Sequence, residues 1–478
     1  MKVFSFNIES VMSIADISKP SWSDLLTRQH LPKLSIICFG VWLHAADGLM
    51  VSTIMPEMIA DLGGAQWVAW TVALYQIGSI VAGAASALLG MRFGLRDAMF
   101  GSAMLYMAGC FVSLVSQNME TMLFGRLLQG FGGGCLVALT FVAVSRLFPA
   151  ELMPRVMGCV SVVWGTSALI GPLVGGVFSE LEFWRGAYIF FIVQAGLLAL
   201  WIRAGLGNDL AGDRNAARIP VIRLVLLTLA VLVFASAGID VQYLKSTIFI
   251  CVGIALLILF VIWDRKQKLT RILPVQAFDI STPVGSCIVM LMALFLGSVS
   301  IGVYFPILLI ATYGISALVA GYILALGAIG WSLAAVSISG IQKQNEKIVI
   351  LSGISLVPLS LGAMAWALPN GPLWLVAVLV ALEGTGLGMA WTFILKRGIE
   401  LAPAADKDRM ATAIPTLQRL AMALGAAVCG IIANASGFTE HLNRAGAGLI
   451  AENLFTVAAF VSMLGIVAAF GFLRDPVA

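Results

Sequence analysis

The stretch Gly165–Gly176 reads GTSALIGPLVGG and lies inside an apolar run long enough to form a buried helix. Six consecutive positions of it contain Gly171, Pro172, Gly175 and Gly176. A proline costs about 3 kcal/mol in a helix interior and a glycine about 1 kcal/mol, so a helix in water is poorly served by this composition. The stretch indicates a helix whose small residues are needed for close packing against a neighbour.

The composition predicts that this helix lies in a membrane. Of the 478 residues, 60% are hydrophobic and 11% are charged, whereas an ordinary globular domain has about 25% charged residues. The mean hydropathy is +1.00. Apolar runs of at least 18 residues recur along the chain, and each is long enough to cross a hydrocarbon core of about 30 Å. We therefore expect an all-α integral membrane protein surrounded by the lipid bilayer.

Fourteen apolar runs are predicted to span the membrane. The seventh and eighth are the shortest. The expected spans are residues 34–56, 67–90, 98–116, 121–146, 156–178, 186–205, 221–238, 246–263, 284–309, 316–339, 348–368, 372–395, 411–434 and 450–473.

The distribution of basic residues predicts the orientation. With the N-terminus in the cytoplasm, 23 of the 28 Lys and Arg residues fall in cytoplasmic segments and 2 within spans, while the outer loops hold only Arg185, Lys245 and Arg444. So strong a positive-inside bias favours fourteen spans with both termini cytoplasmic, in the cytoplasmic (inner) membrane of a bacterium. The net charge of +4 follows from this bias and gives no indication of a nucleic-acid partner.

One half of the sequence repeats the other. An offset of 254 places Gln-Gly-Phe-Gly (129–132) over Glu-Gly-Thr-Gly (383–386), and also Gly171 over Gly425 and Gly176 over Gly430. Parallel repeats of this kind are typical of transporters whose substrate site lies between the halves. The predicted organisation is a cytoplasmic N-terminus with a short interfacial helix (1–33), a six-helix bundle (34–205), cytoplasmic loops with two inserted helices (206–283), a second six-helix bundle (284–473) and a C-terminal tail (474–478).

The opening stretch is interpreted as part of the seam between these bundles. Small residues let helices approach closely in lipid, where apolar side chains gain little by leaving the lipid tails. Gly171-x-x-x-Gly175 has the spacing of such a close approach, and Pro172 can bend the helix where the halves rock. We expect this face to pack against a helix of the opposite half, with a static packing seam as the alternative. The seam residues are Gly165, Gly171, Pro172, Gly175 and Gly176.

Four charged residues lie deep in the predicted spans: Asp47, Arg126, Glu383 and Arg419. A charge at the centre of a span costs about 2.5–3.5 kcal/mol, so intramembrane charges usually carry function. Asp47 is the strongest candidate for the proton carrier, because burial raises the pKa of a carboxylate and a nearby arginine lowers it. The alternative is a fixed ion pair with Arg126, which in the first case tunes Asp47.

Glu383 is predicted to be a second proton or cation site, with a salt bridge to Arg419 as the alternative. Further polar and aromatic residues in the spans are candidates for an amphipathic substrate pocket, although aromatic residues in membrane helices are more often packing residues. The predicted substrate-binding residues are His44, Tyr75, Gln76, Gln129, Trp164, Gln194, Trp331, Trp391 and Arg419.

Three motifs resemble those of the major facilitator superfamily. Gly165–Gly176, followed by Trp184-Arg185, resembles its antiporter motif, and Gly125–Gly133 resembles its Arg-Gln-Gly motif. Asp47–Pro56 has the Asp and Pro spacing of the fourteen-span drug–proton antiporters. The resemblance implies two pseudo-symmetric six-helix bundles plus two inserted helices, with export driven by inward proton flow.

One departure from the superfamily pattern concerns the loop after the second span. The superfamily reads Gly-x-x-x-Asp-Arg-x-Gly-Arg-Arg there, whereas this chain has ALLGMRFGLR over residues 87–96, with Met91 in place of the acidic residue. That acidic residue usually helps to latch the halves. Either Asp97 partly substitutes for it or the latch is weaker.

The sequence lacks the motifs of two other classes of protein. The chain has three histidines, no His-x-x-x-His or Cys-x-x-Cys and no Gly-x-x-x-x-Gly-Lys-Ser/Thr, which argues against a metalloenzyme and a nucleotide-driven pump. We expect a proton-coupled exporter of amphipathic small molecules or drugs that has no cofactor or metal and acts as a monomer. Alternatives are an exporter of an anionic metabolite such as a siderophore, a proton-coupled symporter, and work with periplasmic adaptor proteins.

Overall fold

A computed structural model describes residues 22–149, 151–207, 220–267, 271–338, 341–403, 406–440 and 442–473. Every regular element in these ranges is a helix, which confirms the all-α prediction. Thirteen of these helices are long and apolar enough to cross a membrane, and α7 is shorter. The main helices are α1 (Leu31–Leu62), α2 (Val68–Phe93), α3 (Leu95–Leu114), α4 (Met119–Leu147), α5 (Met153–Glu180), α6 (Arg185–Gly205), α7 (Val221–Ser236), α8 (Tyr243–Lys266), α9 (Pro283–Val303), α10 (Phe305–Tyr313), α11 (Ala317–Ser337), α12 (Glu346–Asn370), α13 (Leu373–Glu400), α14 (Lys407–Ala435) and α15 (Arg444–Phe472).

Local sequence explains where several helices begin. The side chains of Asn118, Thr282, Ser316 and Asn443 accept hydrogen bonds from backbone N–H groups in the first turns of α4, α9, α11 and α15. Such caps satisfy donors that have no partner within the helix. The predicted span 284–309 was wrong as a single helix, because α9 ends at Val303 and α10 starts at Phe305, directly before Pro306.

The short helix predicted before the first span is a 3₁₀ helix, Trp22–Leu26. Its Leu25 is buried against the bundle, whereas Trp22 and Leu26 are exposed. The Trp22 ring lies under the Arg155 guanidinium of α5, 5.9 Å from its ring centroid. Residues 1–21 of the predicted cytoplasmic N-terminus lie outside the described residues.

The internal repeat is visible in how the helices pack. In the first half, α4 lies against α2 and α3; in the second, α13 lies against α11 and α12. Gly130 and Gly134 of α4 meet the α2 backbone and Gly132 meets the α3 backbone. At the offset of 254, Gly384 and Gly388 meet α11 and Gly386 meets α12. The small residues thus make the same helix approaches in both halves, which explains why the repeat preserves them.

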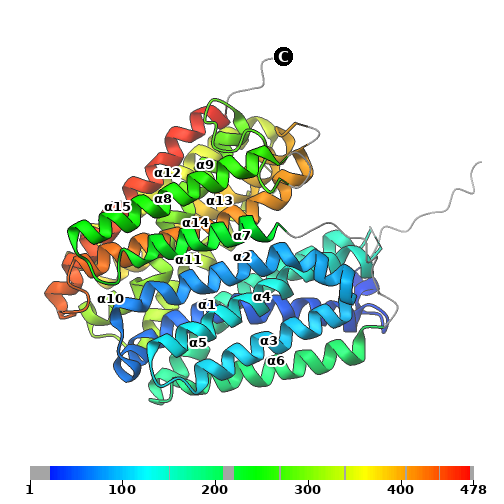
Figure 1. Cartoon of the computed structure of the whole chain (residues 1–478), viewed down its shortest axis with the longest axis horizontal. Coiled ribbons are helices and arrows are strands. Elements are labelled where there is room, and N and C mark those ends of the chain that lie inside the picture. The colour runs from blue at the N-terminus through cyan, green and yellow to red at the C-terminus, as the bar shows by residue number, and fades with distance from the viewer. Residues whose placement is uncertain are drawn as a thin grey trace, which may run out of the picture.

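The two halves, α1–α6 and α9–α15, meet along two equivalent helix pairs, α2 with α14 and α5 with α11. In Figure 1 they converge where α1 ends and diverge toward the end where α1 begins. Contacts between the halves gather where they converge, which we call the closed end. Gly176 abuts Leu318, Pro172 abuts Gly321, Gly430 abuts Ala69, and the Asn434 side chain donates to Gln66 O at 3.1 Å.

The inserted helices α7 and α8 form a hairpin that lies in front of the divergence in Figure 1. Helix α7 packs on α14 and α2, one helix from each half. A buried ion pair joins the hairpin, since Arg223 Nη1 lies 2.5 Å from Asp264 Oδ1. Asp264 also accepts the backbone N–H groups of Ile272 and Leu273, which fixes the chain as it leaves α8.

The seam prediction was only partly right. Gly165, Pro172 and Gly176 do face α11 of the opposite half. Gly171 and Gly175 instead face α1 of their own half: an added Cβ would lie 2.8 Å from Ala46 O and 2.7 Å from Met50 O, respectively. Helix α5 is sandwiched between α1 and α11, so small residues are needed on two sides of it.

Candidate functional site

Asp47 and Arg126 form a closed ion pair inside the first half. Asp47 of α1 is 0% exposed and Arg126 of α4 is 1% exposed, and Arg126 Nη1 lies 2.6 Å from Asp47 Oδ2. The second carboxylate oxygen, Oδ1, is buried without a hydrogen-bond partner in the described part of the chain. One oxygen therefore pairs with the arginine, while the carboxylate's other polar neighbour is the buried Tyr106 hydroxyl.

Three further groups hold the Arg126 guanidinium. Its Nη1 donates to Gln129 Oε1, its Nε donates to Thr71 O at 3.3 Å, and its plane lies 4.3 Å from the centroid of the Tyr75 ring. Gln129 is fixed in turn by donating to Ser113 Oγ at 3.0 Å. Arg126 thus keeps two neutral acceptors and a cation–π contact even when Asp47 is uncharged.

His44 connects this ion pair to the surface of the first half. The ring of His44 stacks on Tyr75, and its Nδ1 lies 2.8 Å from Tyr75 Oη. Its other neighbour is Trp164 of α5, whose ring centroid is 6.1 Å away and which is 44% exposed. The structure therefore brings together Asp47, Arg126, Gln129, His44, Tyr75 and Trp164 from the predicted set.

Arg419 crosses between the halves instead of pairing with Glu383. Its Nη1 donates to Ser79 O of α2 at 3.1 Å, and no carboxylate lies within ion-pair distance of it among the described residues. Gln76 makes a second cross-half contact, with its Nε2 3.7 Å from Met422 Sδ of α14. The alternative of a Glu383–Arg419 salt bridge was wrong because α14 turns Arg419 toward α2, away from α13.

Glu383 lies on the α13 face that meets α9. It is 5% exposed, and its Oε1 has no hydrogen-bond partner in the described ranges. Ser298 of α9 lies beside the carboxylate as its polar neighbour, although its hydroxyl makes no hydrogen bond of ordinary geometry in the described ranges. Both groups are buried polar atoms that a water, proton or ligand could satisfy.

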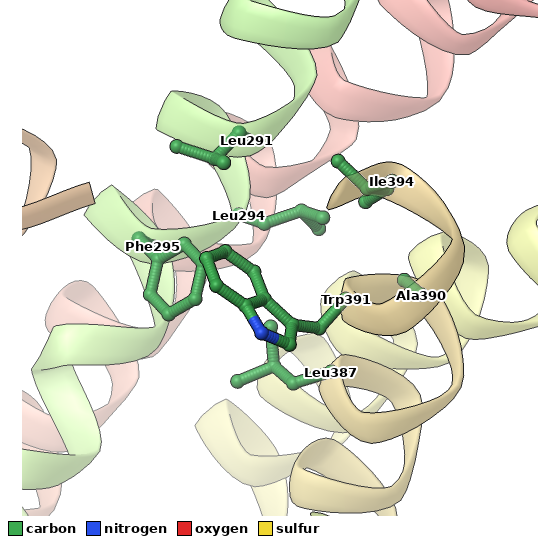
Figure 2. A pocket seen from close by; sticks show the side chains of 7 residues that line it. All are labelled: Leu291, Leu294, Phe295, Leu387, Ala390, Trp391 and Ile394. Atoms are coloured by element: carbon green, nitrogen blue, oxygen red, sulfur yellow. The ribbon is translucent and has the colours of Figure 1, made fainter. Parts of the chain in front are cut away.

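The predicted residues Trp331 and Trp391 come together around Phe295, which the sequence analysis missed. The ring centroid of Phe295 lies 5.4 Å from that of Trp391 and 6.1 Å from that of Trp331. Figure 2 shows Phe295 beside Trp391 at a small apolar cavity between α9 and α13. The cavity is further lined by Leu291, Leu294, Leu387, Ala390 and Ile394.

Two predicted residues lie elsewhere. Gln194 of α6 accepts a hydrogen bond from Trp42 Nε1 at 2.6 Å, on the contact between α6 and α1 within the first half. Asp97 is paired with Arg96 and with Arg203 of α6, so its ion pairs stay in the first half and do not latch the two halves.

Ser113, Thr71 and Ser79 were also missed as supporting groups. A signal for Ser113 was present, because Gly109 and Ser113 form a small-residue face one turn long on the third span. An added Cβ on Gly109 would meet Gln129 N at 2.6 Å, so this face is where α4 approaches. The carbonyls of Thr71 and Ser79 are backbone groups that no sequence pattern announces.

A family comparison agrees with this geometry. The Major Facilitator Superfamily model matches residues 37–426. The chain belongs to the major facilitator superfamily. Within this superfamily, a probable multidrug-efflux transporter of Mycobacterium tuberculosis is 27% identical over 466 residues, covering 94% of this chain and 96% of the relative. Multidrug resistance protein 3 of Bacillus subtilis is 25% identical over 425 residues, covering 86% and 81%.

Among solved structures, a POT family transporter in complex with a thioalcohol-conjugated peptide has a TM-score of 0.67 and 16% identity, covering 92% of this chain and 96% of that one. At this identity the likeness concerns the superfamily fold alone. The multidrug-efflux relatives and the fold together identify this chain as a transporter of the superfamily.

Proposed function

We propose that this transporter exports amphipathic small molecules in exchange for protons by alternating access. The observation that carries the proposal is the Asp47–Arg126 pair, in which a fully buried carboxylate has one oxygen on the arginine and one oxygen without a hydrogen bond in the described chain. A buried carboxylate without complete hydrogen bonding is poised to take up a proton, because desolvation penalises its charged form.

Proton uptake at Asp47 weakens its hold on Arg126 without leaving the arginine unsatisfied. Gln129 Oε1 and Thr71 O remain as acceptors, and the Tyr75 ring remains as a cation–π partner. The pair can then break and re-form at a cost well below that of exposing a bare charge to lipid. His44, Tyr75 and Trp164 supply the route from the surface of the first half to the pair.

The position of the closed end supports the assignment of this conformation as open to the cytoplasm. With the termini in the cytoplasm, as the basic residues predict, α1 ends at the outer face, so contacts between the halves close the outer side. The proposed cycle starts from this inward-facing state, in which substrate enters from the cytoplasm or inner leaflet. The inward proton gradient then drives its release outside.

The experiment compares Asp47→Asn with the wild type in inverted vesicles loaded with a pH-sensitive dye. Asparagine keeps the size and the hydrogen-bonding capacity but cannot titrate. We expect substrate-induced proton movement and uphill transport to be lost, while binding of a neutral substrate survives. Asp97→Asn is the matched control, because Asp97 is a half-exposed carboxylate of the same half with its own arginine. Uphill transport at the wild-type rate by Asp47→Asn refutes the proposal.

Substrate charge is the finer part of the proposal. Two features favour lipophilic cations: Glu383 Oε1, which is buried without a hydrogen bond in the described ranges, and the cluster of Phe295, Trp331 and Trp391. A carboxylate and aromatic faces both attract positive charge. An exporter of anionic amphiphiles is the second candidate, and Arg419, which lacks a carboxylate partner in the described chain, favours it. A panel of cationic dyes and anionic metabolites, tested on Glu383→Gln and Arg419→Gln, separates the two. If the substrates are lipophilic cations, dye export is expected to be lost in Glu383→Gln and retained in Arg419→Gln.

A further inference from the structure

Two prolines lie in the first helical segments of the two halves, which are α1 and α9–α10. Pro56 lies in α1 and Pro306 lies at the start of α10, 250 residues later. Proline has no backbone N–H, so the carbonyl four residues earlier loses its helical donor. The carbonyls left in this way belong to Ser52 and Gly302, which are also 250 residues apart.

The structure shows where one of these carbonyls finds its donor. Ser52 Oγ donates to Gly302 O at 2.6 Å, from α1 of one half to α9 of the other. This hydrogen bond therefore crosses directly from one half to the other. Ser52 is 5% exposed, and Gly302 is partly buried.

The same hydroxyl has a second acceptor within reach. Ser52 Oγ is 3.0 Å from Gly48 O, one turn earlier in its own helix. The neighbouring Thr53 uses only this kind of bond, donating to Leu49 O at 2.9 Å. A serine hydroxyl has one proton to donate, so it serves either the opposite half or its own helix.

We propose that the Ser52–Gly302 hydrogen bond is a switchable latch of the closed end. In the closed state the hydroxyl satisfies the carbonyl that Pro306 leaves without a donor. When the halves separate, the Ser52 hydroxyl turns to Gly48 O and keeps a hydrogen bond, while Gly302 O needs water as its donor. Opening is thereby coupled to hydration of the Gly302 carbonyl between α1 and α9, because a carbonyl left without any hydrogen bond is costly.

The latch rests on the alternating-access part of the proposed function, but its test needs no substrate or proton gradient. The readout is the distance between spin labels at Leu181→Cys and Glu440→Cys, in a chain whose exposed Cys251 is replaced by Ser. Both label sites are exposed and follow helices that end at the closed end, one in each half. Opening of the closed end lengthens this distance.

The first variant is Ser52→Ala. One ordinary hydrogen bond is removed from the closed state alone, so the ratio of open to closed molecules is expected to rise about two- to tenfold. Ser300→Ala is the matched control, since Ser300 of α9 is buried and donates only to Gly297 O of its own helix. Ser52→Thr retains the hydroxyl and is expected to resemble the wild type. An unchanged ratio in Ser52→Ala, or an equal change in Ser300→Ala, overturns the latch.

The second variant, Pro306→Ala, supplies an amide N–H to Gly302 O from within the helix. The carbonyl then no longer depends on Ser52, so Ser52→Ala is expected to have little further effect in the Pro306→Ala chain. Additive effects of the two substitutions would mean that Ser52 acts through something other than this carbonyl. A loss of proton coupling in Asp47→Asn has no bearing on either result, so this proposal and the proposed function fail independently.

Discussion

Replacing Gly176 by alanine is expected to destabilise the contact between the two halves, but only in the conformation in which the closed end is closed. An added Cβ at Gly176 would lie 2.7 Å from Leu318 Cα, and the backbone of α11 cannot rotate away as a side chain can. The helices must part by about 1 Å, and such overpacking costs about 1–3 kcal/mol. Because the contact exists only when the closed end is closed, this cost shifts the open-to-closed ratio by about 5- to 150-fold.

Gly175→Ala is the matched substitution one residue earlier. Its Cβ would lie 2.7 Å from Met50 O and 3.0 Å from Thr53 Cβ, both in α1 of the same half. That contact persists in either conformation, so the cost is expected to lower the stability of the first half without moving the conformational ratio. The gain of about 1 kcal/mol in helix propensity on replacing glycine applies to both variants and cancels in the comparison.

Two measurements separate the variants: the Leu181–Glu440 label distance and the thermal unfolding midpoint in detergent. Gly176→Ala is expected to lengthen the label distance at a midpoint close to that of the wild type. Gly175→Ala is expected to lower the midpoint with the wild-type distance. The same pair of changes in both variants would refute the assignment of Gly176 to the seam and of Gly175 to the interior of the half.

Three other outcomes are expected. Arg126→Gln alone leaves the buried Asp47 unpaired and is expected to lower the unfolding free energy by about 3–5 kcal/mol. Adding Asp47→Asn to Arg126→Gln is expected to restore most of that loss. Denaturation of the single and double variants measures the coupling, and additive losses would contradict it. Burial alone would raise the pKa of Asp406, but the Val275 N–H, Arg409 and Arg271 outweigh it and hold that pKa below its usual value. The Asp406 contacts that join the chain after α8 to the start of α14 are then fully present above the usual carboxyl pKa, about 3.9. They are lost as the pH falls through the lowered value. Proteolysis of the segment after α8, measured between pH 3 and 6, tests this pH dependence, and Asp406→Asn is expected to remove it. Equal cleavage of the wild type across this range would contradict the role of Asp406. Reporters fused after Lys268 and in the loop after α14 are expected to lie on opposite sides of the membrane, and a common side would exclude fourteen spans.

Most of the fold was predictable because lipid constrains the sequence strongly. Each apolar run of sufficient length contains a helix, and the repeat at an offset of 254 preserves glycines wherever α4 and α13 touch their neighbours. The break between α9 and α10 was missed although Pro306 marked it, since hydropathy continues unchanged through residue 309. Length and polarity locate helices in the sequence, but they do not report a lost backbone hydrogen bond.

The candidate site was predictable in its chemistry and less so in its partners. Charges inside spans identified Asp47, Arg126 and Glu383, and the structure confirms that Asp47 and Arg126 are paired. Whether Asp47 carries the proton stays a prediction. The rotation of each helix about its axis was beyond the sequence, because α5 has a neighbour on either side of Gly171–Gly176 and α14 can turn Arg419 toward α2 or α13. Rotations of this kind are decided by packing among all the helices at once.

The Asp47–Arg126 pair also bears on how the protein is made. The two residues are 79 positions apart in the chain, and at about 5–20 residues per second a ribosome needs roughly 4–16 s to go from one to the other. During that interval α1 enters the membrane with an acid that has no partner, at a cost of about 2.5–3.5 kcal/mol. Helix α4 arrives with the arginine that completes the pair, so the first half can settle before the second is synthesised. Helix α13 enters later with Glu383, which has no arginine partner in the described chain, so its insertion gains nothing from such a pair.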